Sequence, residues 1–416
     1  MTASASRARS ARRLGAMLLV VALVVGFEHP AGLRAFPARV LYAAESWLRR
    51  PEKGRVAWMT ANATEEGLNG TVLDSLRRAL AAQGTEAFLV VRGNHVAYEW
   101  YPSWSGPNTR HGTAAMAKAV TGTIMLLAAA TDRRIGLDDP AWKYIPAWQG
   151  DSIRSRIRIR DLASHESGMD DVDFSDPGDG WKRQYFEHRD ERFTIALLRA
   201  PILFPPGTRV AYSGVGYYAL AYALASSLQP QYDVRTFLQE RIMQPLGIPD
   251  ADWRLSYDEW YRLDGMTLYA IGSGASYTAR AAARMGELML DRGRWDGRWL
   301  LDSGLVARAV RPAAGLLPPD KNGYQRSPPG EVSGWEINSR GSWPEVPRDA
   351  FAGIGAGHNV ILVVPSLDLV MVRLGRTLWP NDPDFEAVLR DSLFDPLMHA
   401  VIGPSSRMRL GVAPRP

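Results

Sequence analysis

Near the start of the body of the chain, hydrophobic and polar positions follow first a helix pattern and then a strand pattern. Over residues 65–82, apolar side chains recur every three to four positions, which predicts an amphipathic helix. The apolar segments 87–91 and 96–100 then flank Gly93-Asn94. This glycine-containing turn between two apolar runs predicts a β-hairpin.

The C-terminal part of the chain has the same kinds of element in the opposite order. Two apolar segments, 359–364 and 369–374, flank a four-residue turn that begins at Pro365, which predicts a second hairpin. A helical pattern from 385 to about 401 then closes the body of the chain.

The middle of the chain, about 119–290, is mostly helical in pattern. Helices are expected at 119–130, 193–200, 216–227, 234–243 and 278–292. We therefore predict an α+β fold, in which the terminal hairpins form an antiparallel sheet with packed helices and a mostly helical subdomain is inserted between them. This domain is expected to span 51–405, with 406–416 as a C-terminal tail.

The first 50 residues have the pattern of an export segment. Four arginines between positions 7 and 13 precede an apolar run, Leu14–Phe27, which is typical of a secretory signal. The run has 14 residues, fewer than the roughly 20 of a spanning helix, and no clear cleavage site follows. A cleaved signal and an uncleaved membrane anchor both fit, and a buried N-terminal helix is the third alternative. Either export reading places the body in the periplasm or on the outer side of the inner membrane.

Charge and composition exclude several classes of function. The net charge of +5 comes from the first 50 residues, which hold eight Arg and two Glu, whereas the remainder has 41 basic and 42 acidic residues. No nucleic-acid-binding face is therefore expected in the body. The chain has no cysteine, and none of its seven histidines is paired at metal-ligand spacing, so we expect neither a metal site nor a cofactor.

A lysine near the start of an apolar helix is the first candidate for chemistry. Lys118 precedes a buried-type helical face, and Ala115 lies three residues earlier on the same side of the helix. Burying an ammonium group is costly, so a lysine at such a position can serve as a general base. Taken alone, the segment is more typical of an exposed helix lysine.

Two further segments follow along the chain. Tyr212-Ser213-Gly214 lies at the mouth of a helix after a Pro-Pro-Gly turn, where a tyrosine hydroxyl can relay a proton. The glycines at 355 and 357 and His358 run directly into a strand, and clustered glycines let another backbone approach closely. Packing of a loop tyrosine and a flexible glycine turn are the structural alternatives.

In this order, the segments resemble the serine β-lactamase and penicillin-binding protein superfamily, in particular its class C β-lactamase-like esterase branch. The family motifs S-x-x-K, Y-x-N or Y-S-x, and K-T-G or H/G-x-G correspond to Ala115-Met116-Ala117-Lys118, Tyr212-Ser213-Gly214 and Gly355-Ala356-Gly357. The connecting sequence is similar as well, over 135–140, 157–169, 245–248 and 364–370. The resemblance covers roughly residues 65–400.

The resemblance implies an acyl-enzyme mechanism. Lys118 takes the proton of the attacking group, and Tyr212 relays it to the leaving group. The backbone N–H groups of Ala115 and His358 form the oxyanion site. Ser213, Gly214, Gly355 and Gly357 belong to the substrate-binding edge. The implied partner is a small ester, amide or peptide; the sequence predicts no oligomeric state.

The chain departs from the family at the nucleophile. Ala115 has no hydroxyl, and loss of a nucleophile in such a unit lowers turnover by about a million-fold. Natural loss and an introduced replacement both fit. Gly214 and Gly355 replace an amide and a lysine of the family motifs, which favours esters or small amides over β-lactams. The leading hypothesis is an acyl hydrolase scaffold that is inactive as written. The alternative is a periplasmic pseudoenzyme that binds cell-wall peptides or a protein partner.

Overall fold

The computed structural model of the chain describes residues 58–174, 176–319 and 326–410. The predicted export segment at 1–50 lies outside these ranges. The N-terminal hairpin, the C-terminal strands and the helical middle belong to one compact unit.

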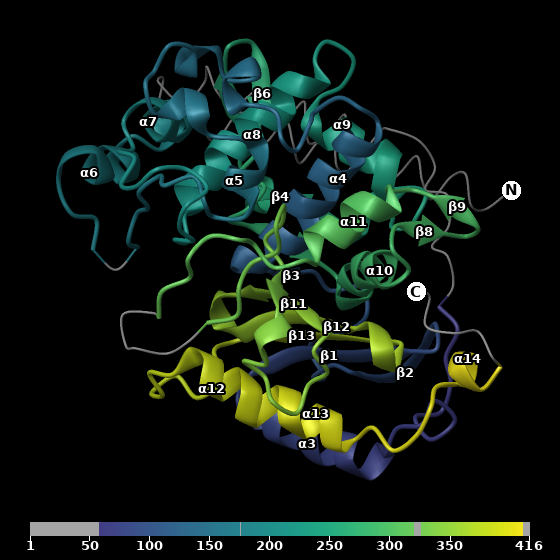
Figure 1. The fold of residues 1–416 in the computed structure, drawn as a ribbon. Coiled ribbons are helices and arrows are strands. Elements are labelled where there is room, and N and C mark those ends of the chain that lie inside the picture. The colour runs from purple at the N-terminus through teal and green to yellow at the C-terminus, as the bar shows by residue number, and fades with distance from the viewer. Residues whose placement is uncertain (1–57, 175, 320–325, 411–416) are drawn as a thin grey trace, which may run out of the picture. The chain divides into compact units, whose positions relative to one another are not determined.

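A six-stranded antiparallel sheet joins the two ends of the described chain (Figure 1). Its strand order is β10-β11-β12-β13-β1-β2. The strands are β1 (Thr85–Arg92), β2 (His95–Trp100), β10 (Glu336–Ile337), β11 (Phe351–Gly355), β12 (Asn359–Val364) and β13 (Leu369–Gly375). In the centre of the sheet, β1 pairs with β13, so that Val90 lies opposite Met371. Both predicted hairpins, and the α+β fold class, are confirmed.

The central strands are apolar on both faces because helices cover both faces of the sheet. Phe88 and Val90 of β1 belong to one buried cluster, and the alternate residues Leu89 and Val91 belong to another. The first cluster packs against α3 (Gly70–Ala82), α12 (Phe385–Leu389) and α13 (Asp395–His399), which lie below the sheet in Figure 1. The second lies beneath α10 (Ala279–Leu290), which packs on β12 and β13. This covering of both faces explains why the strands read as nearly continuous hydrophobic runs.

The predicted helical middle contains the expected helices and several short elements that the periodicity did not reveal. The helices are α4 (Ile124–Thr131), α5 (Ile159–Ala163), α6 (Gly180–Glu187), α7 (Arg192–Leu198), α8 (Gly214–Leu228), α9 (Val234–Leu238) and α11 (Ser303–Ala309). The short strands are β3 (His111–Gly112), β4 (Trp253–Leu255), β5 (Tyr261–Leu263), β6 (Met266–Leu268), β7 (Ala275–Tyr277), β8 (Arg294–Trp295) and β9 (Arg298–Trp299). Strands of two or three residues are too short for a hydrophobic period to show.

The helix that leads into α4 is buried at every residue. From Lys118 to Ala129, every residue is buried. The 18 residues Ala114–Thr131 are long and apolar enough to cross a membrane, but 78% of them are buried inside the protein. The segment is therefore a core helix, and its polar residues are held inside the molecule.

The predicted C-terminal tail begins with residues that are packed on the body. α14 (Ser406–Arg409) starts where the Ser406 hydroxyl donates to Glu66 at 2.6 Å, and Arg407 forms an ion pair with Asp291 at 2.8 Å. Residues 406–410 thus continue the ordered body beyond the predicted boundary at 405.

Glu287 makes the stability of this fold depend on pH. Its carboxyl group is buried on α10, and burial raises its pKa to about 8 despite Arg284 at 3.4 Å; Asp291 and Asp368 raise it further, and Arg407 opposes them. Between about pH 4.5 and 8 the folded chain holds a proton that the unfolded chain has lost. The free energy of unfolding should therefore fall as pH rises through this window.

Urea denaturation at a series of pH values measures this slope. Glu287→Gln should flatten it, and the exposed Glu259→Gln should leave it unchanged. An equal slope in the wild-type chain and in Glu287→Gln would contradict the assignment.

Candidate active site

Lys118 is held at the start of the core helix by contacts from two distant segments. Its Nζ donates hydrogen bonds to the Tyr212 hydroxyl at 2.6 Å and to the Gly272 carbonyl at 2.7 Å. Nζ also lies over the rings of Tyr212 and Tyr217, at 4.6 and 5.2 Å from their centroids. The structure thus brings together Lys118 and Tyr212, which are 94 residues apart in the chain.

Tyr212 lies on the loop before α8 and is fixed by a histidine that the sequence analysis did not select. The His165 ring stacks on the Tyr212 ring, with centroids 4.7 Å apart. His165 Nδ1 accepts the backbone N–H of Ser213 at 3.1 Å, which leaves the ring proton on Nε2. Burial, together with the charge of Lys118, lowers the pKa of His165 to about 3. His165 is therefore a neutral positioning group for the phenol.

Ser213 and Gly214 are placed as a helix cap. The buried Ser213 hydroxyl accepts the N–H of Gly216 at 2.9 Å and so caps α8. Next to it, Asp171 accepts the N–H of Val215 at 3.1 Å. Neither Ser213 nor Gly214 lines the cavity described below; both lie at the N-terminal end of α8, directly after Tyr212 in the chain.

The glycine-rich strand meets the start of the core helix at Gly355. A Cβ atom added there would lie 2.3 Å from the Thr113 carbonyl oxygen and 3.0 Å from the Ala115 nitrogen. Only glycine allows β11 to approach this closely. Gly357, at φ +78°, faces the end of β13 instead, near the Gly375 carbonyl.

His358 lies apart from Lys118 and Tyr212. Its ring stacks on Phe385 of α12, with centroids 4.0 Å apart, and Nδ1 accepts the N–H of Leu378 at 3.0 Å. Burial and the neighbouring Arg373 lower the pKa of His358 to about 4. His358 therefore packs between the sheet and α12, whereas Gly355 of the same segment lies beside the backbone of Ala115.

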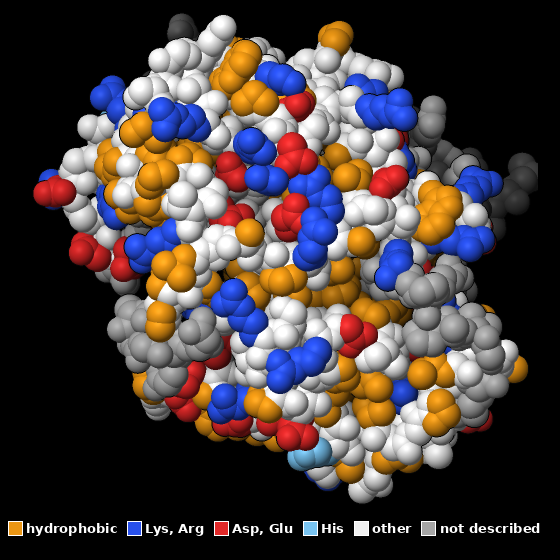
Figure 2. All heavy atoms as spheres, viewed as in Figure 1, with side chains coloured by type: hydrophobic (Ala, Val, Ile, Leu, Met, Phe, Trp, Pro, Cys, Tyr) orange, Lys and Arg blue, Asp and Glu red, His pale blue; other side chains and the backbone are white. Residues whose placement is uncertain are grey.

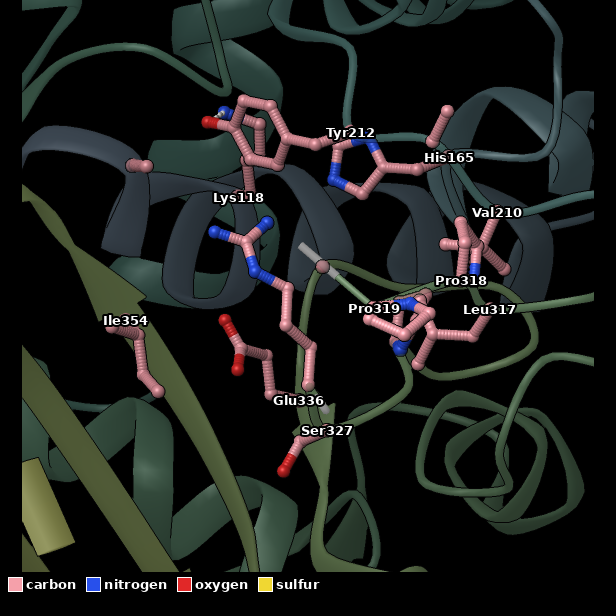
Figure 3. Close-up of a pocket in the computed structure, with 15 residues that line it drawn as sticks. Lys118, His165, Val210, Tyr212, Leu317, Pro318, Pro319, Ser327, Glu336 and Ile354 are labelled. Atoms are coloured by element: carbon pink, nitrogen blue, oxygen red, sulfur yellow. Dashed lines mark hydrogen bonds between the residues drawn. The ribbon is translucent and has the colours of Figure 1, made fainter. Parts of the chain in front are cut away.

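A cavity of about 210 Å³ opens in front of Lys118 and Tyr212 (Figure 3). Lys118, Tyr212 and His165 lie at one end, and Glu336 and Ser327 lie at the other. Apolar side chains form the walls, namely Ala115, Val210, Ala211, Leu317, Pro318, Pro319, Pro329 and Ile354. Hydrophobic side chains with Lys and Arg side chains beside them also lie in the hollow between the helical part and the sheet (Figure 2).

Besides His165, three polar residues of the cavity were not anticipated from the sequence: Arg326, Ser327 and Glu336. Burial, with Glu386 nearby, raises the pKa of Glu336 well above its usual range, and Arg326 opposes this shift. Ser327 is 4% exposed, and its buried hydroxyl has no hydrogen-bond partner among the described residues. Arg326 and Ser327 lie in a loop and Glu336 lies in the two-residue strand β10, so no sequence pattern pointed to them. No cluster of three or more His, Asp or Glu side chains within the described ranges can hold a metal ion.

The arrangement is suited to proton transfer at a bound carbonyl compound. Lys118 and Tyr212 share a short hydrogen bond beside the methyl group of Ala115. Thr113, the nearest hydroxyl in sequence, donates to the Ala275 carbonyl at 3.0 Å and is buried there. The site therefore holds an amine and a phenol in hydrogen-bond contact next to a side chain that has no hydroxyl or thiol.

Comparisons with known proteins agree with this fold. A family model described as Beta-lactamase matches residues 73–395. The chain is 26% identical over 338 residues to 6-aminohexanoate-dimer hydrolase of Paenarthrobacter ureafaciens, covering 76% of this chain and 77% of that protein. It is 29% identical over 216 residues to the D-alanyl-D-alanine-carboxypeptidase/endopeptidase AmpH of Escherichia coli, covering 46% of this chain and 53% of that protein. A penicillin-binding protein homologue from Caulobacter crescentus superposes with a TM-score of 0.59 at 15% identity, covering 82% of this chain and 99% of that one.

Proposed function

Because this chain belongs to the Beta-lactamase family of serine hydrolase folds, we propose that its cavity binds a small amide, ester or peptide without cleaving it. The observation that carries the proposal is the hydrogen bond of 2.6 Å between Lys118 and Tyr212 beside Ala115. The proton-transfer pair of an acyl hydrolase is in place, and the residue at the nucleophile position has no hydroxyl. The chain thus has the scaffold of an acyl hydrolase and, with alanine at position 115, is inactive.

The relatives suggest two ligand chemistries. The first relative is named for hydrolysis of a linear amide, the dimer of 6-aminohexanoate, and AmpH is named for D-alanyl-D-alanine peptides. Both ligands pair an amide carbonyl with a carboxylate. In this chain, the Tyr212 hydroxyl is placed to donate to a carbonyl, and Arg326 supplies a second cation within the same cavity. Binding of cell-wall peptides by a periplasmic pseudoenzyme is the specific form that the AmpH similarity favours.

Titration calorimetry with the 6-aminohexanoate dimer and with a D-alanyl-D-alanine peptide tests this proposal. We expect saturable binding of at least one probe and no product by mass spectrometry after long incubation. Ile354→Trp should weaken binding by at least about tenfold, because the indole would fill the cavity next to Lys118.

Ile153→Trp is the matched control, since Ile153 is exposed and does not line the cavity. It should bind like the wild-type chain. Product formation by the wild-type chain would contradict the proposed inactivity. Equal affinity in Ile354→Trp would contradict the proposed binding site.

A further inference from the structure

We propose that the Lys118 amine is a covalent attachment site for an aldehyde or ketone, which it captures as an imine. The inference rests on the cavity of the proposed function, and it adds a ligand class that an acyl hydrolase does not use. The amine lies in surroundings that lack a hydroxyl at position 115, because that residue is alanine.

Lys118 differs from the other lysines of the described chain. Lys143 is paired with Asp139 at 2.8 Å and Lys182 with Asp170 at 3.1 Å, and their side chains are 46% and 31% exposed. Lys118 is 3% exposed, lines the cavity and forms no ion pair with any of the described residues. Its two hydrogen-bond acceptors within the described ranges are a phenol and a backbone carbonyl, both neutral groups. A lysine desolvated in this way is the kind that forms Schiff bases with carbonyl compounds.

Ala115 leaves the approach to the amine open. It lines the cavity with Lys118 and lies three residues before it, on the same face of the helix. A serine there would share a hydrogen bond with the amine and would itself be the group that meets a carbonyl carbon. With a methyl group at 115, the amine is the first nucleophile that a bound carbonyl compound encounters.

Tyr212 is placed to assist the reaction. Its hydroxyl accepts from Nζ at 2.6 Å, so its own proton can be donated to an oxygen in the cavity. His165, stacked on the ring, holds the phenol in this position. The proton donor and the nitrogen that must attack are therefore adjacent.

The step balances without any further reactant. In its uncharged form the amine attacks the carbonyl carbon, a C–N bond forms as the C=O π bond breaks, and the carbonyl oxygen takes a proton from Tyr212. The nitrogen returns a proton to Tyr212, giving a neutral carbinolamine. Loss of the hydroxyl as water, with the second amine proton, leaves the C=N bond. The apolar walls at Val210, Leu317 and Pro318 suit a ligand with a hydrophobic body.

Trapping with benzaldehyde and sodium cyanoborohydride tests the inference on the intact chain. Chymotryptic peptides analysed by mass spectrometry give the extent of alkylation at each lysine. Lys118 should be modified at least about tenfold faster than Lys143 and Lys182, although these two are more exposed. Tyr212→Phe should slow modification at position 118, and Ala115→Ser should suppress it, because the new hydroxyl engages the amine.

Labelling of Lys118 no faster than that of Lys143 and Lys182 would overturn the inference, as would undiminished labelling in Ala115→Ser. Thermal melting of both variants shows whether each variant remains folded. The amide and peptide titrations are read independently. Binding without selective labelling rejects only the covalent site, whereas selective labelling without amide binding rejects the proposed function and leaves the covalent site standing.

Discussion

Replacing Ala115 by serine is expected to give the chain ester hydrolysis at least about a thousand-fold above that of the unaltered protein. Loss of the nucleophile in a catalytic unit of this kind lowers turnover by about a million-fold, and the lysine and tyrosine of the unit are already in contact. Lys118 and Tyr212 are joined at 2.6 Å, and the cavity lies in front of them. The measurement is release of p-nitrophenol from a short-chain ester by Ala115→Ser.

Two variants control this gain. Ala130→Ser makes the same substitution near the end of the same helix, away from the cavity, and should remain inactive. Ala115→Ser combined with Lys118→Met should lose the gained activity, because the serine then has no base. If Ala115→Ser melts like the unaltered chain and binds the amide probe but hydrolyses nothing, the acyl-transfer reading of the site is wrong.

Gly355→Ala is expected to lower the free energy of unfolding by about 3 kcal/mol. The added methyl group would lie 2.3 Å from the Thr113 carbonyl oxygen and 2.7 Å from the Met116 nitrogen. Both are backbone atoms at the start of the core helix, so no side chain can turn away to relieve the contact. β11 and the helix must separate, and urea denaturation measures the loss.

Gly106→Ala is the matched control for Gly355→Ala. A Cβ atom at Gly106 meets nothing within 4 Å, and its φ is not in the left-handed region. This variant should retain full stability. In the Ala115→Ser background, Gly355→Ala should also abolish the gained hydrolysis, since it moves the strand beside residue 115. Equal stability of the two glycine variants would contradict the close approach of β11.

The order of the motifs along the chain predicted more of the fold and the site than any single motif did. The two hairpins and α8 follow from nearly continuous apolar runs, because both faces of the sheet and most of α8 are buried, and α10 follows from its helical period. Lys118 and Tyr212 were paired through the family resemblance, which supplies a spatial relation that spacing of 94 residues cannot.

The remaining site residues depend on tertiary packing. Ser213 caps a helix and His358 stacks on Phe385, and neither relation has a local pattern. Arg326 and Glu336 reach the cavity from a loop and a two-residue strand. His165 stood within a recognised stretch of sequence, but its contact with Tyr212 depends on a fold between segments 47 residues apart.

The pairing of β1 with β13 has a consequence for how the molecule is made. Thr85 is registered with Gly375, so the centre of the sheet joins residues nearly 300 positions apart. A ribosome must release almost the whole chain before this pair can form, and contacts of such long range form slowly. Until then β1 of the N-terminal hairpin lacks its neighbour β13, and the sheet beside the cavity is incomplete. Truncation at the C-terminal end would therefore remove the core of the sheet while leaving most of the helical part intact in sequence.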